Sequence, residues 1–288
     1  MEYNIKNHTY ELKVSDHGAE IKSLRKLGNE LMWQADPAFW GRTSPVLFPL
    51  VGNFYGKEFR YDGKSYTMSQ HGFARDCDFR LVNASEGKLL FELKSNEDTL
   101  AKYPFEFALQ IGYQLDENGV KVTWAVKNPS DRELLFSIGG HPGFNCNLDT
   151  ARLAFYKNGA PVSGKLISNV ISDDGSGCLS DNTDEYALEN GELRLSKELF
   201  DKDALIIENR QADEVVLLND NGEEQVRVCF DAPLFGIWSP VGKNAPFVCI
   251  EPWYGRCDRV SFNKNLSERE YGNRLNPGEV FEVSYTIS

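Results

Sequence analysis

The dominant pattern along this chain is alternation of apolar and polar residues. It occurs in six stretches, at residues 8–14, 88–94, 105–115, 120–128, 224–230 and 279–287. A period of two is typical of β-strands with one buried and one wet face. Helical spacing is confined to residues 196–203, SKELFDKD, which can form a turn or two. The pattern therefore predicts an all-β protein with few short helices.

Turn dipeptides separate the alternating stretches. Asp-Gly occurs at 62–63 and 174–175, and Asn-Gly occurs at 118–119, 158–159, 190–191 and 221–222. These residues tolerate the positive φ that tight hairpin turns require, so they predict antiparallel pairing. We expect a large antiparallel β-sandwich. Residues 172–192 have the most loop-like composition and are expected to form a surface excursion.

The length of 288 residues fits a single domain spanning residues 1–288, because all-β sandwiches reach this size as one unit. The six cysteines form no C-x-x-C pair, and Cys229 and Cys249 lie in apolar runs, so a reducing cytoplasm is expected. No N-terminal signal segment and no stretch of about 18 apolar residues is present. We therefore predict a cytoplasmic protein without membrane spans.

Charge and motifs exclude several classes of partner. The net charge is −12 and no basic cluster occurs, which disfavours nucleic acid. Neither a G-x-x-x-x-G-K-[ST] loop nor a strand-linked G-x-G-x-x-G motif is present, so no nucleotide cofactor is expected. A small molecule is the expected partner. These patterns leave the oligomeric state undetermined.

Four stretches place polar or aromatic groups where strands should end. They are RTSPVLFPLVGNF (42–54), SQHGFARDCDF (69–79), GGHPGFN (139–145) and FVCIEPWYGRCD (247–258). Glu251 follows the apolar run 247–250 and precedes Pro252, which should stop the strand. Its carboxylate should point into a cleft, where desolvation raises the pKa toward neutrality and suits a general base. The alternative is a structural glutamate satisfied by a backbone amide or by the nearby Arg256.

His141 stands between glycines and a proline. Gly139 and Gly140 allow a ligand to approach the backbone, and Pro142 fixes the chain beyond the ring. The imidazole is therefore either an acid–base group or a cap that bonds a loop carbonyl. His71 has similar neighbours in the sequence, with Gln70 before it and Gly72 after it.

A metal centre is not expected from the histidine spacing. His71, His141 and Glu251 are far apart in sequence and match no ligand motif. His8 and His17 lie in ordinary strand and turn contexts and should be solvated.

Aromatic residues flank the polar candidates. Flat rings beside carboxylate and imidazole groups are a common way to hold the apolar face of a sugar ring. Each ring taken singly could equally belong to the core. Taken together they favour a sugar as ligand. They are Phe39, Trp40, Phe73, Trp238, Trp253 and Tyr254.

The motifs QHGFAR, GGHPGFN and CIEPW, in that order, resemble those of the aldose 1-epimerase (galactose mutarotase) family, and within it a LacX-like branch. The resemblance covers nearly the whole chain. It implies a galactose mutarotase-like supersandwich with an open cleft, acting on an aldohexose without metal or cofactor. It also implies that His141 is the general acid, Glu251 the general base, and His71 a sugar-binding residue.

The chain departs from the family pattern at one position. Asn53 stands where the family has a substrate-binding arginine, so Arg42 or Arg75 must supply that charge if it is needed. Asp203 and Asp201 are candidates for the aspartate that grips the substrate. Trp238 is the expected aromatic contact.

Three alternatives to a free-sugar mutarotase stay open. Convergence of Arg42 and Arg75 would suit a hexose 6-phosphate epimerase. A carbohydrate-binding protein without catalysis would use the same cleft. A glycoside hydrolase ranks third because it requires two carboxylates, and these stretches offer one good carboxylate and a histidine.

Overall fold

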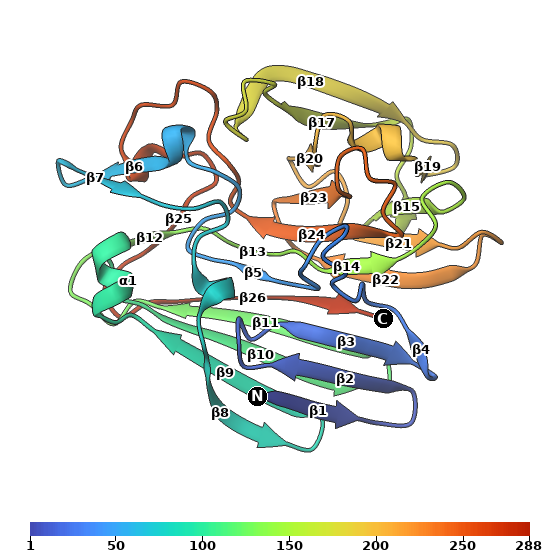
Figure 1. Ribbon diagram of the computed structural model, residues 1–288, viewed down its shortest axis with the longest axis horizontal. Coiled ribbons are helices and arrows are strands. Elements are labelled where there is room, and N and C mark those ends of the chain that lie inside the picture. The colour runs from blue at the N-terminus through green and yellow to red at the C-terminus, as the bar shows by residue number, and fades with distance from the viewer.

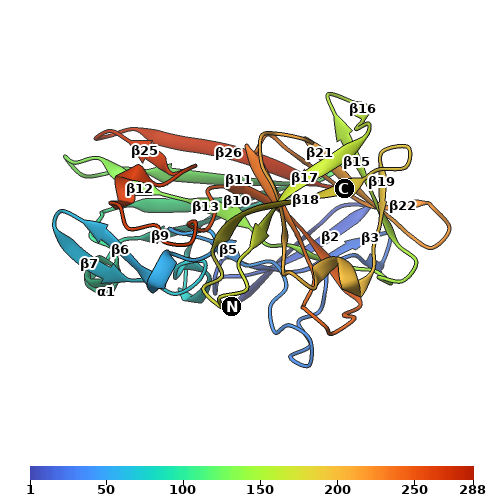
Figure 2. The ribbon, with the colours of Figure 1, turned by 90° about the horizontal axis from the view of Figure 1, so that it is seen from above.

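The computed structural model describes residues 1–288. Strands make up 50% of the chain and helices 7%, which confirms the all-β prediction. Two large antiparallel sheets build the sandwich, and a four-stranded sheet lies beside the larger of them (Figure 1). The view from above shows the β6–β7 hairpin and α1 gathered at one end of the layers (Figure 2). No helix is both long and apolar enough to cross a membrane.

The larger sheet has ten strands. Their order is β16 (Ala160–Pro161), β15 (Arg152–Lys157), β21 (Glu214–Leu218), β22 (Glu224–Phe230), β26 (Val280–Ile287), β11 (Gly119–Lys127), β10 (Ala108–Asp116), β9 (Lys88–Lys94) and β8 (Arg80–Ser85), and β19 (Glu192–Arg194) pairs with β15.

The second sheet has eight strands. Their order is β18 (Leu179–Ala187), β17 (Lys165–Ile171), β20 (Leu205–Ile207), β23 (Leu234–Trp238), β24 (Phe247–Tyr254), β13 (Ile138–Gly140) and β5 (Val46–Leu47), and β14 (Gly143–Asn145) pairs with β24.

Smaller elements complete the fold. The four-stranded sheet is β1 (Glu2–Lys6), β2 (Tyr10–Ser15), β3 (Ile21–Lys26) and β4 (Asn29–Glu30), and two pairs are β6 (Glu58–Tyr61) with β7 (Lys64–Thr67) and β12 (Leu134–Phe136) with β25 (Asn273–Leu275). The helices are α1 (Glu97–Lys102) and the 3-10 turns η1 (Tyr55–Lys57), η2 (Ala74–Asp76), η3 (Lys197–Phe200) and η4 (Leu266–Glu268).

The alternating stretches form strands as predicted. They correspond to β2, β9, β10, β11, β22 and β26, and along β11 buried residues alternate with more exposed ones. The turn dipeptides lie where predicted as well. Both residues of Asp62-Gly63, Asn158-Gly159 and Asn190-Gly191 have positive φ. Local turn chemistry and burial on one face therefore determine most of the strand pairing.

Helix predictions were less accurate. Residues 196–203 form one turn of 3-10 helix, η3, which is the lower limit of the one or two turns predicted. The helix that does form, α1, was missed, although Asn96 and Thr99 make a reciprocal capping box at its start. Residues 172–192 are also more than a surface excursion, because β18 within them pairs with β17 along most of its length.

Pro252 does not end the strand that contains it. Strand β24 continues to Tyr254, and Pro252 pairs with Phe235 of β23. On the other side of β24, the partner is interrupted between β13 and β14. A proline is tolerated at such a gap because its missing N–H costs no ladder hydrogen bond there. The predictions of one domain and of a cytoplasmic location stay predictions.

Candidate active site

Strand register brings the two principal candidates together. Strand β13 pairs Gly139 with Trp253, and β14 pairs Gly143 with Cys249, both against β24. The same register carried across the gap between β13 and β14 puts His141 opposite Glu251. On the other flank of β24, Glu251 pairs with Gly236, which has no side chain to fill the space. The site therefore follows from the pairing of one central strand with its neighbours.

His141 and Glu251 form a buried pair. His141 Nε2 lies 3.4 Å from Glu251 Oε1, and the two side chains are 9% and 1% exposed. Neither Glu251 oxygen has a hydrogen-bond partner, and neither does His141 Nδ1. The alternative of a capping histidine is therefore wrong. The alternative of a structural glutamate is wrong too, because Arg256 bonds to Glu208 and Glu270 instead.

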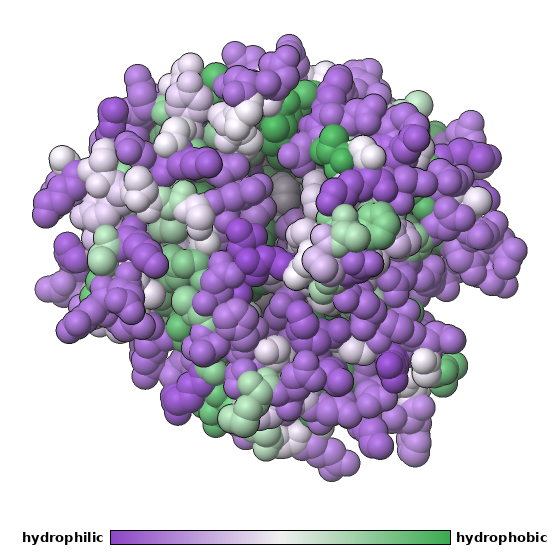
Figure 3. All heavy atoms as spheres, in the orientation of Figure 1, coloured by the Kyte–Doolittle hydropathy of each residue, from purple (hydrophilic) through white to green (hydrophobic).

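The pair lines a pocket of about 320 Å³. The surface is hollowed near the centre of the face shown in Figure 3, among mostly hydrophilic side chains. Two further unpartnered buried atoms, Arg75 Nε and Trp253 Nε1, belong to residues that line this same pocket. Buried polar groups are normally hydrogen-bonded, so their concentration in one pocket marks it as a place for a polar ligand.

Burial controls the protonation of the pair. It raises the pKa of Glu251 well above its usual value, and the nearby indole N–H of Trp253 offsets part of this rise. Burial, followed by the charge of Arg75, lowers the pKa of His141 to about 3. The predicted rise for Glu251 is confirmed. Burial therefore opposes both charged forms, the ionised glutamate and the protonated histidine, although the two groups lie only 3.4 Å apart.

His71 reaches the pocket from the loop after β7. The backbone N–H of Gly52 donates to His71 Nδ1 at 3.1 Å. The backbone N–H of His71 donates to the Gly52 carbonyl at 2.8 Å. An Nδ1 that accepts a hydrogen bond leaves the ring proton of neutral histidine on Nε2. Burial lowers the pKa of His71 well below its usual value, so the ring is neutral. His71 can therefore donate one hydrogen bond to a ligand.

Three tryptophans make the aromatic wall. The Trp40 ring lies 4.7 Å from the His141 ring, and the Trp238 ring lies 5.1 Å from it at nearly a right angle. Trp253 fits between two glycines: a Cβ on Gly139 or Gly236 would come within 2.7 or 2.6 Å of its indole. These glycines are needed for space beside the tryptophan.

The two candidate arginines differ in position. Arg75 lines the pocket, donates to the Gln70 carbonyl at 2.7 Å, and has a pKa lowered to about 10 by burial and by Arg42. Arg42 is not among the lining residues and binds Asp76 at 2.7 Å. The structure therefore brings Arg75, but not Arg42, to the pocket, and the two guanidinium groups do not converge on it.

Asn53 lies outside the inner pocket as well. It lines an adjoining outer pocket of about 640 Å³. Its backbone is fixed by a hydrogen bond, because the backbone N–H of Asp258 donates to the Asn53 carbonyl at 2.9 Å. The Asp258 carboxylate in turn accepts a hydrogen bond from Arg269 Nε at 2.6 Å. Asn53 thus lines the wall of the outer pocket and does not reach the inner pocket that contains His141 and Glu251.

Of the two candidate aspartates, Asp203 is the one that reaches the inner pocket. Asp203 lines both pockets, whereas Asp201 lines only the outer one. Asp203 has a positive φ of 72°, and its Oδ1 accepts from the Ala204 N–H at 2.8 Å. Burial raises its pKa. This backbone conformation is uncommon for a residue with a side chain and turns the carboxylate inward.

Sequence reasoning missed several lining residues. Gly177 comes from the segment expected to be a surface excursion, and Ile171 ends strand β17 just before that segment; both residues border both pockets. Cys257 lines the inner pocket, and Cys249 lies close to the catalytic candidates. Cys249 could have been found from alternation, because it lies two residues before Glu251 on the same face of β24. No local signal indicated Ile171 or Gly177.

Comparison with known proteins identifies the relatives of this chain. The aldose 1-epimerase family model matches residues 1–288. The chromosomal LacX protein of Lactococcus lactis subsp. lactis is 28% identical over 303 residues, covering 100% of this chain and 99% of the relative. The plasmid-encoded LacX protein of the same organism gives the same identity and coverage.

Solved structures agree with this relationship. A galactose mutarotase related enzyme from Lactobacillus acidophilus is 37% identical, with a TM-score of 0.92 over 100% of this chain and 97% of that chain. A galactose mutarotase-like protein from Lactobacillus casei is 28% identical, with a TM-score of 0.92 over 100% and 99% of the two chains. These likenesses confirm the galactose mutarotase-like fold and the resemblance inferred from the motifs.

Proposed function

Because this chain belongs to the aldose 1-epimerase family, we propose that it interconverts the α and β anomers of a free aldohexose. One observation carries the proposal. His141 and Glu251 face each other at 3.4 Å inside a pocket, and Glu251 forms no ion pair with any arginine or lysine. Anomer exchange requires one group that donates a proton and one that accepts a proton, and this pair offers both.

The reaction proceeds by ring opening. Glu251 takes the proton of the anomeric hydroxyl while His141 gives a proton to the ring oxygen, and the C1–O5 bond breaks to leave a free aldehyde. Rotation about C1–C2 presents the other face of the carbonyl. The ring then closes with the two roles reversed, which returns both groups to their starting state. No covalent intermediate with the protein is needed.

The pair can share one proton between its two groups. Burial favours the uncharged form, with the proton on Glu251 and His141 neutral. Moving that proton to His141 gives the form that starts ring opening. Hydrogen bonds from sugar hydroxyls to the carboxylate favour this charged form. Catalysis thus requires that the pair carry one proton in total. This proton is assigned to the pair as a whole, because the two groups titrate together.

Binding groups surround the pair. His71 donates through Nε2, Asp203 accepts, and Arg75 supplies one positive charge to the ring hydroxyls. Trp40 and Trp238 cover the apolar face of the sugar. All five residues line the pocket that contains the pair.

Charge favours a free sugar over a phosphorylated one. The outer pocket carries Lys57 and Lys202 but also Asp173, Asp201 and Asp203. Lys202 is further engaged with Asp184 at 2.7 Å. A phosphate dianion is usually held by convergent guanidinium groups, and only Arg75 is available. The hexose 6-phosphate alternative is therefore less well supported than a neutral aldohexose.

Polarimetry of freshly dissolved α-glucose and α-galactose tests the proposal. We expect the protein to accelerate the decay of optical rotation, and Glu251→Gln to remove nearly all of the acceleration while sugar binding stays measurable by calorimetry. A panel that includes 6-phosphorylated aldoses, followed by NMR saturation exchange, identifies the substrate class. Binding without acceleration for any sugar would instead indicate a carbohydrate-binding protein.

A further inference from the structure

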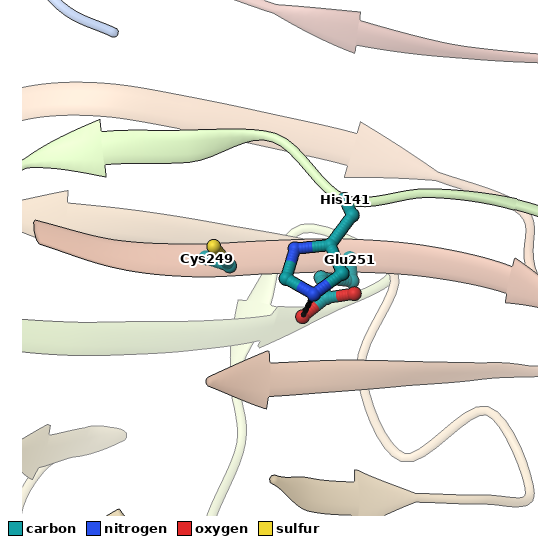
Figure 4. Close-up of side chains that lie close together, drawn as sticks. All are labelled: His141, Cys249 and Glu251. Atoms are coloured by element: carbon teal, nitrogen blue, oxygen red, sulfur yellow. Dashed lines mark ion pairs between the residues drawn. The ribbon is translucent and has the colours of Figure 1, made fainter. Parts of the chain in front are cut away.

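Three side chains that can ligate a metal meet beside the pocket, which two of them, His141 and Glu251, also line. One ligating atom each from His141, Cys249 and Glu251 lies within 4.8 Å of the others, and all three residues are buried (Figure 4). Cys249 and Glu251 alternate on β24 and therefore share one face of the strand, and His141 comes from the gap between β13 and β14. This cluster differs from the combination of His71, His141 and Glu251 considered from the sequence, because the thiol of Cys249 takes the place of His71.

The donor set suits a borderline-soft divalent ion. Zn²⁺ binds histidine nitrogen, cysteine sulfur and carboxylate oxygen at about 2.0–2.3 Å, which sets donor separations of roughly 3.3–3.8 Å in a tetrahedral site. The His141 Nε2 to Glu251 Oε1 distance of 3.4 Å already falls in that range. The cluster limit of 4.8 Å requires a closure of at most about 1.5 Å toward this geometry. Rotation of the short Cys249 side chain and the longer Glu251 side chain can provide it.

A second observation points to a ligand at the same place. His141 Nδ1 and both Glu251 oxygens are buried without any hydrogen-bond partner. A thiolate from Cys249 and a carboxylate from Glu251 would balance the charge of a dication, which makes its burial feasible. Of the other charged groups that line the pocket, Arg75 opposes a cation and Asp203 favours it. The pocket leaves a fourth position for water or a sugar hydroxyl.

We propose that His141, Cys249 and Glu251 form an inhibitory site for Zn²⁺ or a chemically similar ion. Binding releases the Cys249 thiol proton and the proton shared by the pair to solvent, and it forms metal bonds to nitrogen, sulfur and oxygen. An ion held there occupies Glu251 and His141, so neither can exchange protons with a sugar. The inhibitory effect rests on the proposed epimerase function, whereas the binding does not.

Calorimetric titration with Zn²⁺ tests the binding. We expect one ion per chain in the wild type and an affinity lower by at least about tenfold in Cys249→Ser. Cys257→Ser is the matched control, because Cys257 lines the same pocket but does not belong to the cluster; its affinity should equal that of the wild type. Cys249→Ala serves as a second variant if the serine disturbs folding, which thermal denaturation will show.

Two further readouts define the site. Cd²⁺ should produce the ultraviolet absorption of a cadmium–thiolate bond in the wild type and in Cys257→Ser but not in Cys249→Ser. Zn²⁺ should slow mutarotation reversibly, with recovery on addition of a chelator, and each variant is compared with its own zinc-free rate. Unchanged affinity in both Cys249 variants, or no binding by the wild type at millimolar Zn²⁺, would overturn the proposal. Calorimetry remains decisive even if no sugar is turned over.

Discussion

Replacing Gly236 by alanine should disturb the catalytic pair from the neighbouring strand. Gly236 lies on β23 in register with Glu251, and an added Cβ would lie 2.6 Å from Cζ2 and Cη2 of Trp253. Real Cβ contacts are never this close, so the indole must move. Trp253 is only 4% exposed and has little free space around it. Its N–H would shift relative to Glu251, whose pKa it helps to set.

The cost can be estimated from overpacking. Inserting a methyl group into a tightly packed interior destabilises by about 1–3 kcal/mol. For a chain of 288 residues, that loss lowers Tm by about 2–5 °C. The epimerisation rate should fall as well, because the indole and the carboxyl group are displaced together. Differential scanning calorimetry measures the first effect and polarimetry the second.

Gly112→Ala provides the matched control. Gly112 lies within β10, and an added Cβ would meet Leu90 and Thr123 at 3.7 Å, which is ordinary van der Waals contact. This variant should be as stable as the wild type or slightly more stable, since alanine restricts the unfolded chain. If Gly236→Ala matched Gly112→Ala in both Tm and rate, the conclusion that Gly236 is required to leave room for the Trp253 indole would be refuted.

Four other outcomes follow from the site. His141→Asn should lower kcat by about 10²–10⁴, the usual effect of losing one acid–base group, while circular dichroism stays unchanged. His71→Ala should raise KM by about 2- to 10-fold, the worth of one neutral hydrogen bond, and a change confined to kcat would contradict its binding role. The rate should persist as pH falls through 6.5, because burial lowers the His141 pKa to about 3, so that a second proton enters the pair only in strong acid; a half-maximal rate near pH 6.5 would argue against this. Glu251→Gln should gain stability relative to the wild type as pH rises above 4.5, because the folded-state pKa of Glu251 is raised and its ionisation favours unfolding; equal pH dependence of Tm in the two proteins would exclude a buried, protonated Glu251.

The same burial that suits Glu251 to proton transfer makes it costly for folding. A buried carboxyl group with both oxygens unpartnered stabilises nothing in the protein itself. The surrounding sheet must therefore supply the stability, through the apolar residues of β23 and β24. Cys249, on the same strand, is buried and offers its sulfur to the same place. Glu251 and Cys249 thus lie on a strand that is buried along its whole length.

Much of the fold could be read from the sequence because its causes are local. Alternating polarity fixes which face of a strand is buried, and Asn-Gly and Asp-Gly pairs fix the hairpin turns. The short α1 was missed because six residues carry too little periodicity to indicate a helix. Pro252 was misread because its tolerance depends on a gap in the partner strand, which neighbouring residues in the sequence do not reveal.

The candidate site divides in the same way. The sequence by itself determined which residues carry chemistry, since His71, His141 and Glu251 lie in motifs with glycines and prolines around them. Only the tertiary structure decided which of them meet. Antiparallel register places His141 opposite Glu251, and loop positions select Arg75 over Arg42 and Asp203 over Asp201 for the inner pocket. Contacts between residues far apart in the chain depend on how separate strands pair, and desolvation, which sets the pKa values, exists only once those strands have packed.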